Sequence, residues 1–500
     1  MKIVVKETPS LYQPSALDRF FAIPPNDRQA EKKAVGQLVK RSYPRKELAD
    51  ILARYNAEIG NSSSHLDRHL NRVAADSSYF VVTGQQIGLM GGPLYTIYKA
   101  VSCLLLAKAC DAIPLFWLAT EDHDVEEAST LHTIDGVGNI MTHKLHWKTR
   151  GFFVEDLPMG AQQEEKLLKI LQDIGLDAME WTERFVGISY SQAMVRVLVT
   201  IFQDTGLLFI EPKELRQLAV PFFTKEITDC KKISSILTAT TQQILAMGGK
   251  APLAIDAGSN LFYKTDNRQR KRVVYDGGSF RVGDEKIQQK ELLDQIDHSY
   301  HRFSTNAAAR AVLQSSVIPT IAYVAGPAEM AYYRQLHKYH DHHNVPMPWI
   351  VPRISATLLT DKIQALLDKC NLSPWEPTPS SWRHASPNIE KEIEALVEEW
   401  KRAARKIFPA QDIQEAVARF VDGSTVKLSK KLAKAYAQNA GIPQHSLHYI
   451  HNAISPADKP QERIFNFFQF QLATKEKIVH ELLSEVDWAC RGHHYCFLKS

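Results

Sequence analysis

The amino-acid sequence predicts an α/β protein built on a doubly wound parallel sheet. The first observation is the segment 79–99, in which an apolar run ends at Thr83, a glycine-rich turn follows and a helical pattern opens at Pro93. The second is Ile113–Ala119, a near-continuous apolar run typical of a strand buried on both faces. Together they predict a βαβ unit, whose parallel strands end at the same edge of the sheet.

Three further apolar runs extend this predicted sheet: Leu207–Ile210, Thr320–Val324 and Trp349–Val351. They alternate with segments of helical period, and that alternation favours a doubly wound arrangement. Two interruptions, near 130–160 and 245–300, are predicted to be small connecting inserts. The second one carries a hairpin signature, because two strand-like runs flank a polar turn.

The chain divides into three predicted parts. Residues 1–355 form the core, with helices at the N-terminus and the two inserts. Residues 356–458 form a long helical arm, because amphipathic patterns recur at 389–404 and 426–439. Residues 459–500 are expected to return to the core.

Length and composition exclude several classes of protein. Five hundred residues predict two or more domains. A net charge of +4, from 60 basic and 56 acidic residues, argues against a nucleic-acid partner. No apolar run reaches membrane-spanning length, no export signal is present, and the six cysteines form no C-x-x-C pair. We therefore expect a cytoplasmic protein with free thiols and no membrane span.

The glycine-rich turn predicts an anion-binding site. It spells neither the dinucleotide fingerprint nor the P-loop, so it indicates a phosphate, a carboxylate or a nucleotide without further precision. A helix that starts at Pro93 leaves backbone N–H groups free to bind an anion. Gln85 and Gln86 add side-chain amides, and Tyr95 and Lys99 share one helical face. Lys99 either reaches a phosphate or is a solvated charge.

Four polar residues, Glu121 to Asp124, follow the second strand. Adjacent carboxylates repel each other unless they bind a cation, an ammonium group or sugar hydroxyls. His123 is a candidate general base near neutral pH. Alternatively, Asp122 or Asp124 caps a helix that begins at Val125. We expect one of the two to be the cap and at least one of the other residues to bind substrate.

Two later segments add candidates at the same edge. Gly326 and Glu329 repeat the arrangement of strand, Gly-Pro turn and helix, so Glu329 either contacts the ligand or compensates the helix dipole. Arg353 follows another strand and either clamps a carboxylate or phosphate or forms a structural ion pair.

Two histidine-rich segments are weaker candidates. LHKYHDHHN is interpreted as a solvated helix end, and the ligand spacing of CRGHHYC is too tight for the usual zinc knuckles. No metal site is predicted.

Five segments carry a resemblance to a known family. TGQQIGLMGGPLYTIYK and FWLATEDHDVEE resemble the signature of the bacillithiol-synthesis cysteine-adding enzymes, BshC. Three others resemble later blocks of that family in the same order: IPTIAYVAGPAEMAYY, PMPWIVPRISATLL and PQERIFNF.

This resemblance implies a Rossmann-like nucleotide fold similar to class I aminoacyl-tRNA synthetases, and a coiled-coil arm that forms a homodimer. It also implies the last step of bacillithiol synthesis, in which a ligase joins cysteine to the glucosamine amine of glucosaminyl-malate. ATP is the expected source of activation, through an acyl-adenylate or an acyl-phosphate. The synthetases' H-x-G-H motif is missing, and Lys427–Lys431 imitates their K-M-S-K-S loop inside a predicted arm helix.

The predicted catalytic residues are Asp122, His123 and Asp124. The predicted substrate- or nucleotide-binding residues are Thr83, Gly84, Gln85, Gln86, Gly92, Pro93, Tyr95, Lys99, Glu121, Gly326, Glu329 and Arg353. Two alternatives stay open. One is a tRNA-binding or adaptor protein on a synthetase-like core, suggested by the basic helix 426–439, and the other is a ligase of the same fold for another amino acid.

Overall fold

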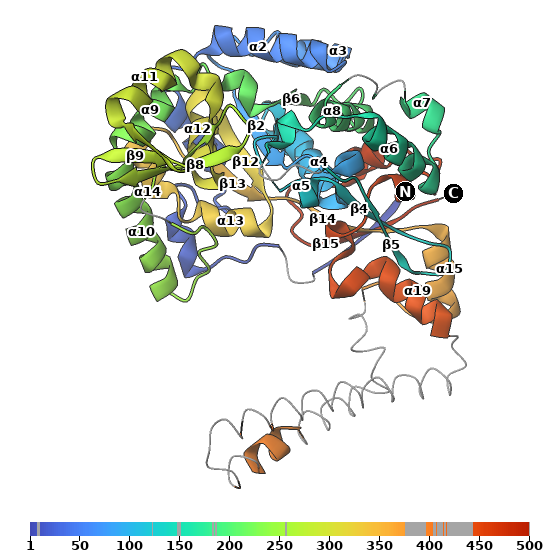
Figure 1. Ribbon diagram of the computed structural model, residues 1–500. Helices are drawn as coiled ribbons and strands as arrows, with labels where there is room; N and C mark the ends of the chain where they lie inside the picture. The colour runs from blue at the N-terminus through green and yellow to red at the C-terminus, as the bar shows by residue number, and fades with distance from the viewer. Residues whose placement is uncertain are drawn as a thin grey trace.

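A computed structural model describes the chain apart from residues 8–10, 123, 148–151, 183–184, 186–187, 256–257, 376–396, 404–406, 408–413, 415–416, 418–443 and 500. Three sheets, a two-stranded hairpin and the helices around them make up the described part (Figure 1).

Five parallel strands form the central sheet, in the order β13-β12-β2-β3-β6. These are β2 (Phe80–Gln85), β3 (Ile113–Leu118), β6 (Leu208–Ile210), β12 (Thr320–Ala325) and β13 (Trp349–Pro352). All five coincide with the predicted apolar runs, and almost every residue in them is buried. The predicted α/β class and parallel sheet are confirmed.

The strand order reverses between β2 and β12. From β2 the chain builds outward through β3 to β6, whereas β12 pairs with the other side of β2 and leads to β13. The hydroxyl of Thr83 in β2 donates a hydrogen bond to the carbonyl of Val324 in β12, over 2.9 Å. Such a reversal opens a crevice at the carboxyl ends of the two strands, where doubly wound proteins bind ligands.

Helices cover the sheet and fix the segments around this crevice. Helix α4 (Leu94–Ala109) packs on β2, β3 and β12, while α1 (Ala30–Leu38) packs on β12 and β13. Helix α8 (Tyr190–Ile201) packs on the glycine-rich turn, which contains the 3-10 turn η2 (Leu89–Gly91). Two short helices follow β12, namely α13 (Pro327–Tyr333) and α14 (His337–His343).

The remaining helical segments connect or cover the sheets. The α-helices are α2 (Arg45–Glu58), α3 (Ser64–Leu70), α5 (Val125–Ala128), α6 (Ala161–Asp173), α7 (Ala178–Thr182), α9 (Val220–Thr228), α10 (Cys230–Ala246), α11 (Gln289–Ser299), α12 (Ala307–Val317), α20 (Phe468–Gln471) and α21 (Ile478–Glu485). The 3-10 turns are η1 (Ala16–Phe20), η3 (Val154–Asp156), η4 (Pro212–Leu215), η5 (Tyr300–Arg302), η6 (Pro456–Asp458) and η7 (Gln461–Arg463).

The two interruptions of the sheet are β-structures. The first is a hairpin of β4 (Thr130–Ile134) and β5 (Ile140–Lys144). The second contributes to a five-stranded antiparallel sheet in the order β10-β9-β8-β7-β11, at the left of Figure 1. Its strands are β7 (Leu261–Lys264), β8 (Arg270–Asp276), β9 (Ser279–Val282), β10 (Glu285–Gln288) and β11 (Phe303–Thr305). The predicted hairpin between β7 and β8 is confirmed.

A third sheet brings the ends of the chain together, at the right of Figure 1. Strand β15 (His493–Phe497) lies between β1 (Lys2–Lys6) and β14 (Ser355–Leu359). Helices α15 (Asp361–Lys369) and α19 (Gln444–Ile454) pack beside it around a small separate core. The first predicted arm helix lies partly, and the second wholly, outside the described residues.

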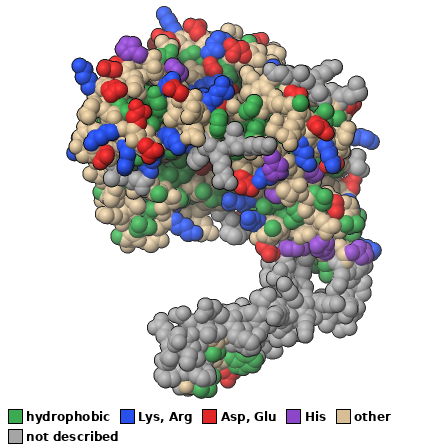
Figure 2. Space-filling view, viewed as in Figure 1, with side chains coloured by type: hydrophobic (Ala, Val, Ile, Leu, Met, Phe, Trp, Pro, Cys, Tyr) green, Lys and Arg blue, Asp and Glu red, His purple; other side chains and the backbone are tan. Residues whose placement is uncertain are grey.

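The surface shows no single dominant charge on the face seen in Figure 2, where basic and acidic side chains are interspersed. This mixture agrees with the net charge of +4. Among the helices that the structure describes, none combines the length and apolar character needed to span a bilayer.

Candidate functional site

Three adjoining cavities open at the reversal point of the sheet. The central cavity, about 310 Å³, lies at the ends of β2 and β12. The outer cavity, about 630 Å³, lies between the glycine-rich turn, the β4–β5 hairpin and the segment 459–466. The inner chamber, about 260 Å³, lies under the second insert. The central cavity shares wall residues with each of the other two, so the three form a series.

The predicted residues are distributed over this series. Nine line the central cavity: Gly84, Gln85, Gln86, Tyr95, Lys99, Asp122, Gly326, Glu329 and Arg353. Gly92, Pro93 and Asp124 line the outer cavity, and Glu121 lines the inner chamber. Thr83 is fully buried within the sheet. His123 lies outside the described residues.

An ion pair between Lys99 and Glu329 forms one wall of the central cavity. The Lys99 ammonium also donates to the Gly84 carbonyl over 2.8 Å and to Gln85 Oε1 over 2.9 Å. Burial lowers the pKa of Lys99, and the Glu329 carboxylate only partly offsets it. Lys99 is therefore a buried charge with committed partners, and its donors hold the end of β2 in place.

Glu329 has further partners that fix its carboxylate. It accepts hydrogen bonds of 2.8 Å from the Tyr323 hydroxyl and from the Gly326 N–H. Burial tends to raise the pKa of Glu329, but the charges of Lys99 and Arg310 outweigh that tendency and keep the pKa below its usual value. Glu329 is thus an ionised group that shapes the wall.

Arg310 is a cation of the central cavity that the sequence did not reveal. It projects from α12, lines both the central cavity and the inner chamber, and donates to the hydroxyls of Tyr323 and Tyr332. Its hydrogen-bond partners there are neutral phenols, and its charge also acts on the nearby Glu329 carboxylate. The one sequence signal was a lone arginine in the apolar helix AAARAVL.

The glycine-rich turn is a tightly held support. Gly92 has a φ of +73°, and a Cβ on Gly88 would lie 2.7 Å from the Gly92 Cα. The side-chain amide of Asn466 donates to the carbonyls of Met90 and Gly92, over 2.9 and 3.0 Å. These contacts tie the turn to the C-terminal segment.

The expectation of free N–H groups at the start of α4 is wrong for its first residue. The Leu94 N–H donates to the carbonyl of Phe465 over 2.9 Å. The C-terminal segment therefore occupies the position that the sequence assigned to an anion. The residues of the segment 79–99 could not predict this partner, because it lies more than 360 residues away in the sequence.

The acidic segment after β3 has divided roles. Glu121 is buried and paired with Arg216 at 3.0 Å, and burial raises the pKa of its carboxyl. Asp124 caps α5 by accepting from the Glu127 N–H over 3.0 Å, which confirms one of the two expected alternatives. Asp122 lies at the junction of the inner chamber and the central cavity. Of the described members, Asp122 is therefore the one best placed to contact substrate.

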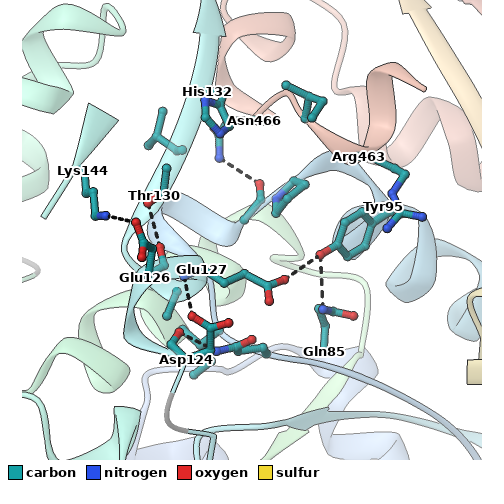
Figure 3. A pocket seen from close by; sticks show the side chains of 18 of the residues that line it. Gln85, Tyr95, Asp124, Glu126, Glu127, Thr130, His132, Lys144, Arg463 and Asn466 are labelled. Carbon is teal, nitrogen blue, oxygen red and sulfur yellow. Dashed lines mark hydrogen bonds and ion pairs between the residues drawn. The ribbon is translucent and has the colours of Figure 1, made fainter. Parts of the chain in front are cut away.

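Polar side chains mark the passage from the central to the outer cavity. The Tyr95 hydroxyl lies between the Gln85 amide at 3.4 Å and the Glu127 carboxylate at 3.5 Å (Figure 3). Gln86 donates to the Asp124 carbonyl over 2.9 Å. Partial burial and the nearby charges of Asp124 and Asp122 raise the pKa of Glu127. A carboxylate with a raised pKa is suited to accepting a proton.

Basic residues surround the outer cavity. Lys144, His132 and Arg463 line it (Figure 3), as does Lys459, and Arg463 also borders the central cavity. Lys144 pairs with Glu126. Among the described residues, Arg463 and Lys459 have no carboxylate within ion-pair distance. Glu127 and Arg463 were not among the residues predicted from the sequence, although Arg463 is the third residue of the Q-E-R segment.

Arg353 forms a buried ion pair with Glu462. Its guanidinium forms two hydrogen bonds with the Glu462 carboxylate, of 2.7 and 3.0 Å, and both side chains are buried. Arg353 borders the central cavity, but its charge is neutralised within the protein. The structural ion pair is therefore the alternative that the geometry supports.

The histidine-rich segments have protein partners. His343 contacts Glu226 and His342 contacts Asp229, each at 2.9 Å. His493 bridges the hydroxyls of Ser355 and Thr357, at 2.8 Å each. Within the described ranges, no group of three or more histidine, cysteine, aspartate or glutamate side chains is placed to hold a metal ion.

Comparison with known proteins adds a family to this geometry. The model described as "Bacillithiol biosynthesis BshC, N-terminal Rossmann-like domain" matches residues 8–354, and "Bacillithiol biosynthesis BshC, C-terminal coiled-coil domain" matches residues 411–498. Among similar proteins are three named "Putative cysteine ligase BshC". That of Chlorobium phaeobacteroides is 29% identical over 88% of this chain and 86% of its own length. Those of Bacillus licheniformis and Thermus thermophilus are 29% and 28% identical, over 87% and 93% of this chain and 87% and 96% of their own lengths.

Proposed function

The chain belongs to the BshC family, and from that premise we propose that it is the ligase of the last step of bacillithiol synthesis. It joins the carboxyl group of cysteine to the glucosamine amine of glucosaminyl-malate. The observation that carries this proposal is the series of three cavities at the reversal point of the sheet, since such a series accommodates a small donor, a reaction centre and a larger acceptor.

The reaction requires activation of the cysteine carboxylate, because a carboxylate is a poor electrophile. We propose that ATP supplies it, as an acyl-adenylate with release of pyrophosphate or as an acyl-phosphate with release of ADP. The sugar amine then attacks the acyl carbon, the C–N bond forms, and AMP or phosphate leaves with the electron pair of the broken C–O bond. The amine loses a proton, which a base must accept.

Two residues of the central cavity suit these steps. The Arg310 cation lies where negative charge develops on the acyl oxygens and the leaving group, and a preorganised cation in a partly closed site stabilises such charge effectively. Glu127 lies where the acceptor enters from the outer cavity, and its raised pKa suits it to take the amine proton. Lys99 and Glu329 hold the ends of β2 and β12 at the same cavity.

The outer cavity is assigned to glucosaminyl-malate. Its volume of about 630 Å³ is the largest of the three, and Lys459 and Arg463 offer positive charge for the two malyl carboxylates. Arginine binds carboxylates in a two-point fork, which gives orientation as well as affinity. The match to the coiled-coil family model supports the further proposal that two chains pair through the arm.

Ligation by the purified full-length protein tests the proposed function. The protein is incubated with cysteine, glucosaminyl-malate and ATP, and mass spectrometry follows the product and the nucleotide released. We expect an amide product that depends on all three substrates, with AMP or ADP identifying the activated species. Product formed equally well from another amino acid, and none from cysteine, would assign the fold to a different ligase.

The outer-cavity assignment predicts a selective effect of Arg463→Gln. Loss of a charge-assisted hydrogen bond costs about 1.5–3 kcal/mol, so KM for glucosaminyl-malate should rise about 10- to 100-fold. KM for an acceptor without the malyl group, such as methyl glucosaminide, should be unchanged. Lys475→Gln removes an exposed charge remote from the cavities and serves as the control. An equal loss with both acceptors would contradict malyl recognition by Arg463.

A further inference from the structure

The inner chamber is a small, separate compartment behind the central cavity. Its walls come from β3, the second insert and the start of α12, and it communicates with the central cavity past Ala119, Asp122, Ala307 and Arg310. With a volume of about 260 Å³, it suits a ligand of amino-acid size.

A buried donor without an acceptor lines this chamber. The indole N–H of Trp117, in β3, has no hydrogen-bond partner among the described residues, and the side chain is 1% exposed. An indole nitrogen is a donor only, so a ligand atom that pairs with it must be an acceptor. Buried polar groups are paired in nearly all folded proteins, so an unpaired donor beside a cavity is a candidate contact for a ligand.

The other walls define the chemistry of that ligand. Phe262 and Pro212 supply apolar surface, and the Arg270 guanidinium stacks 3.7 Å from the Phe262 ring centre while it donates to the Thr305 carbonyl. Glu121 is already paired with Arg216, a cation that it shares with Glu155. The far wall of the chamber therefore combines the Trp117 N–H with aromatic and apolar surface and with the polar side chains of Arg270, Thr305 and Asn306. Sulfur is a soft, weakly accepting atom that such a mixed wall can contact.

Charged groups of both signs stand at the junction with the central cavity. Asp122 is an acidic group there, and Arg310 is a basic one on the first turns of α12, an eleven-residue helix that begins at Ala307. An ammonium and a carboxylate on one carbon atom match this pair. A bound amino acid would then direct its side chain into the chamber and its carboxyl group toward the reaction centre.

We propose that the inner chamber is the side-chain pocket for the amino-acid substrate, and that the Trp117 indole N–H donates to a thiol sulfur bound there. The α-ammonium lies against Asp122 and the carboxylate faces Arg310 in the central cavity. The identity of the substrate as cysteine rests on the proposed function, whereas the location of the pocket rests on Trp117 and the chamber. The thiol is thereby held away from the activated carboxyl group.

The tryptophan signal tests this directly, without ligation. The chain is labelled with ¹⁵N-tryptophan, and the Trp117 indole resonance is identified by its loss in Trp117→Phe, which keeps an aromatic ring and removes the N–H. L-Cysteine is titrated with reductant, with and without a non-hydrolysable ATP analogue. We expect the Trp117 resonance to shift with L-cysteine and to move much less with L-alanine, which lacks sulfur.

Binding measured by calorimetry separates the contacts. Trp117→Phe should weaken the affinity for L-cysteine about fivefold, which corresponds to the loss of one neutral hydrogen bond, and should leave the affinity for L-alanine unchanged. Asp122→Asn should weaken the affinity for L-cysteine about 10- to 100-fold. It should leave the affinity for 3-mercaptopropionate unchanged, because that compound lacks the ammonium group. Trp488→Phe, at a partly buried tryptophan outside the three cavities, is the matched control.

Two results would overturn the proposal. In the first, L-cysteine binds without moving the Trp117 resonance, and its affinity is unchanged in Trp117→Phe. This result would exclude the inner chamber as the cysteine site and would leave the proposed ligase function unaffected. In the second, the Trp117 resonance shifts equally with L-alanine and with L-cysteine, which would exclude a contact between the indole N–H and the thiol. If the Trp117 response to L-cysteine holds but no ligation occurs, the proposed function fails and the pocket assignment survives.

Discussion

Replacement of Glu127 by glutamine is expected to lower kcat for ligation by about 10²- to 10⁴-fold, the contribution typical of a positioned general base. Glutamine keeps the size and the hydrogen bond with Tyr95, so KM for either substrate should change little. The physical reason is that the attacking amine must lose a proton at the boundary of the central and outer cavities, where Glu127 lies.

The pH profile gives this prediction a second readout. Only the carboxylate form accepts a proton, so kcat should rise with pH through the pKa of Glu127 and then level off. Partial burial and the charges of Asp124 and Asp122 raise that pKa, so the rise should lie above the ordinary glutamate value of about 4.3. In Glu127→Gln the rise attributable to this group should disappear.

The test is to measure kcat from the product formed in quenched assays at saturating substrate concentrations, from pH 4 to pH 8. Glu165→Gln removes an exposed carboxylate of α6 outside the cavities and should keep the parent profile. A Glu127→Gln variant with parental kcat and an unchanged acidic limb would remove Glu127 from proton transfer. A variant with parental kcat but raised KM for the acceptor would make it a binding residue instead.

The sheet was predictable because its signal is local. Each central strand is a short apolar run that is buried on both faces, and a run such as Ile113–Leu118 carries that pattern in its own residues. Strand β1, Lys2–Lys6, is different, because it is an edge strand whose partner β15 lies almost 490 residues later. Its five residues show no regular alternation of buried and exposed positions, and its partner is distant in the sequence, so no local pattern was strong enough to predict it.

The site was predictable in location but only partly in role. Residues at the ends of β2 and β12 gather around one cavity because parallel strands share an edge. The role of a charged residue depends on its partner, however, and partners come from remote segments: Arg216 neutralises Glu121 and Glu329 neutralises Lys99. Arg310 escaped notice for the same reason, since a lone arginine in a helix gains its role only when the cavity forms beside it.

Arg353 and Glu462 carry the largest expected effect on stability. Arg353→Met should lower the free energy of unfolding of the cooperative unit containing the central sheet by about 3–5 kcal/mol, because it leaves Glu462 buried without its cation. Glu462 is 2% exposed, and besides Arg353 it accepts from the Ser355 hydroxyl and the Ala356 N–H, over 3.0 and 3.2 Å. Burial tends to raise the pKa of Glu462, and the charge and hydrogen bonds of Arg353, with smaller contributions from His493 and the Ala356 N–H, bring the pKa below its usual value.

Urea unfolding followed by fluorescence measures this loss as a lower transition midpoint at constant slope. Arg54→Met is the matched control, because Arg54 pairs with Glu58 and Glu214 at the surface and should cost no more than about 1 kcal/mol. The double variant Arg353→Met with Glu462→Gln should recover part of the loss, since no unpaired buried charge remains while an acceptor for Ala356 is kept. A single Arg353→Met variant as stable as the Arg54→Met control would show that Arg353 is held for a ligand of the central cavity and not for the fold, and would restore the carboxylate-clamp interpretation of this residue.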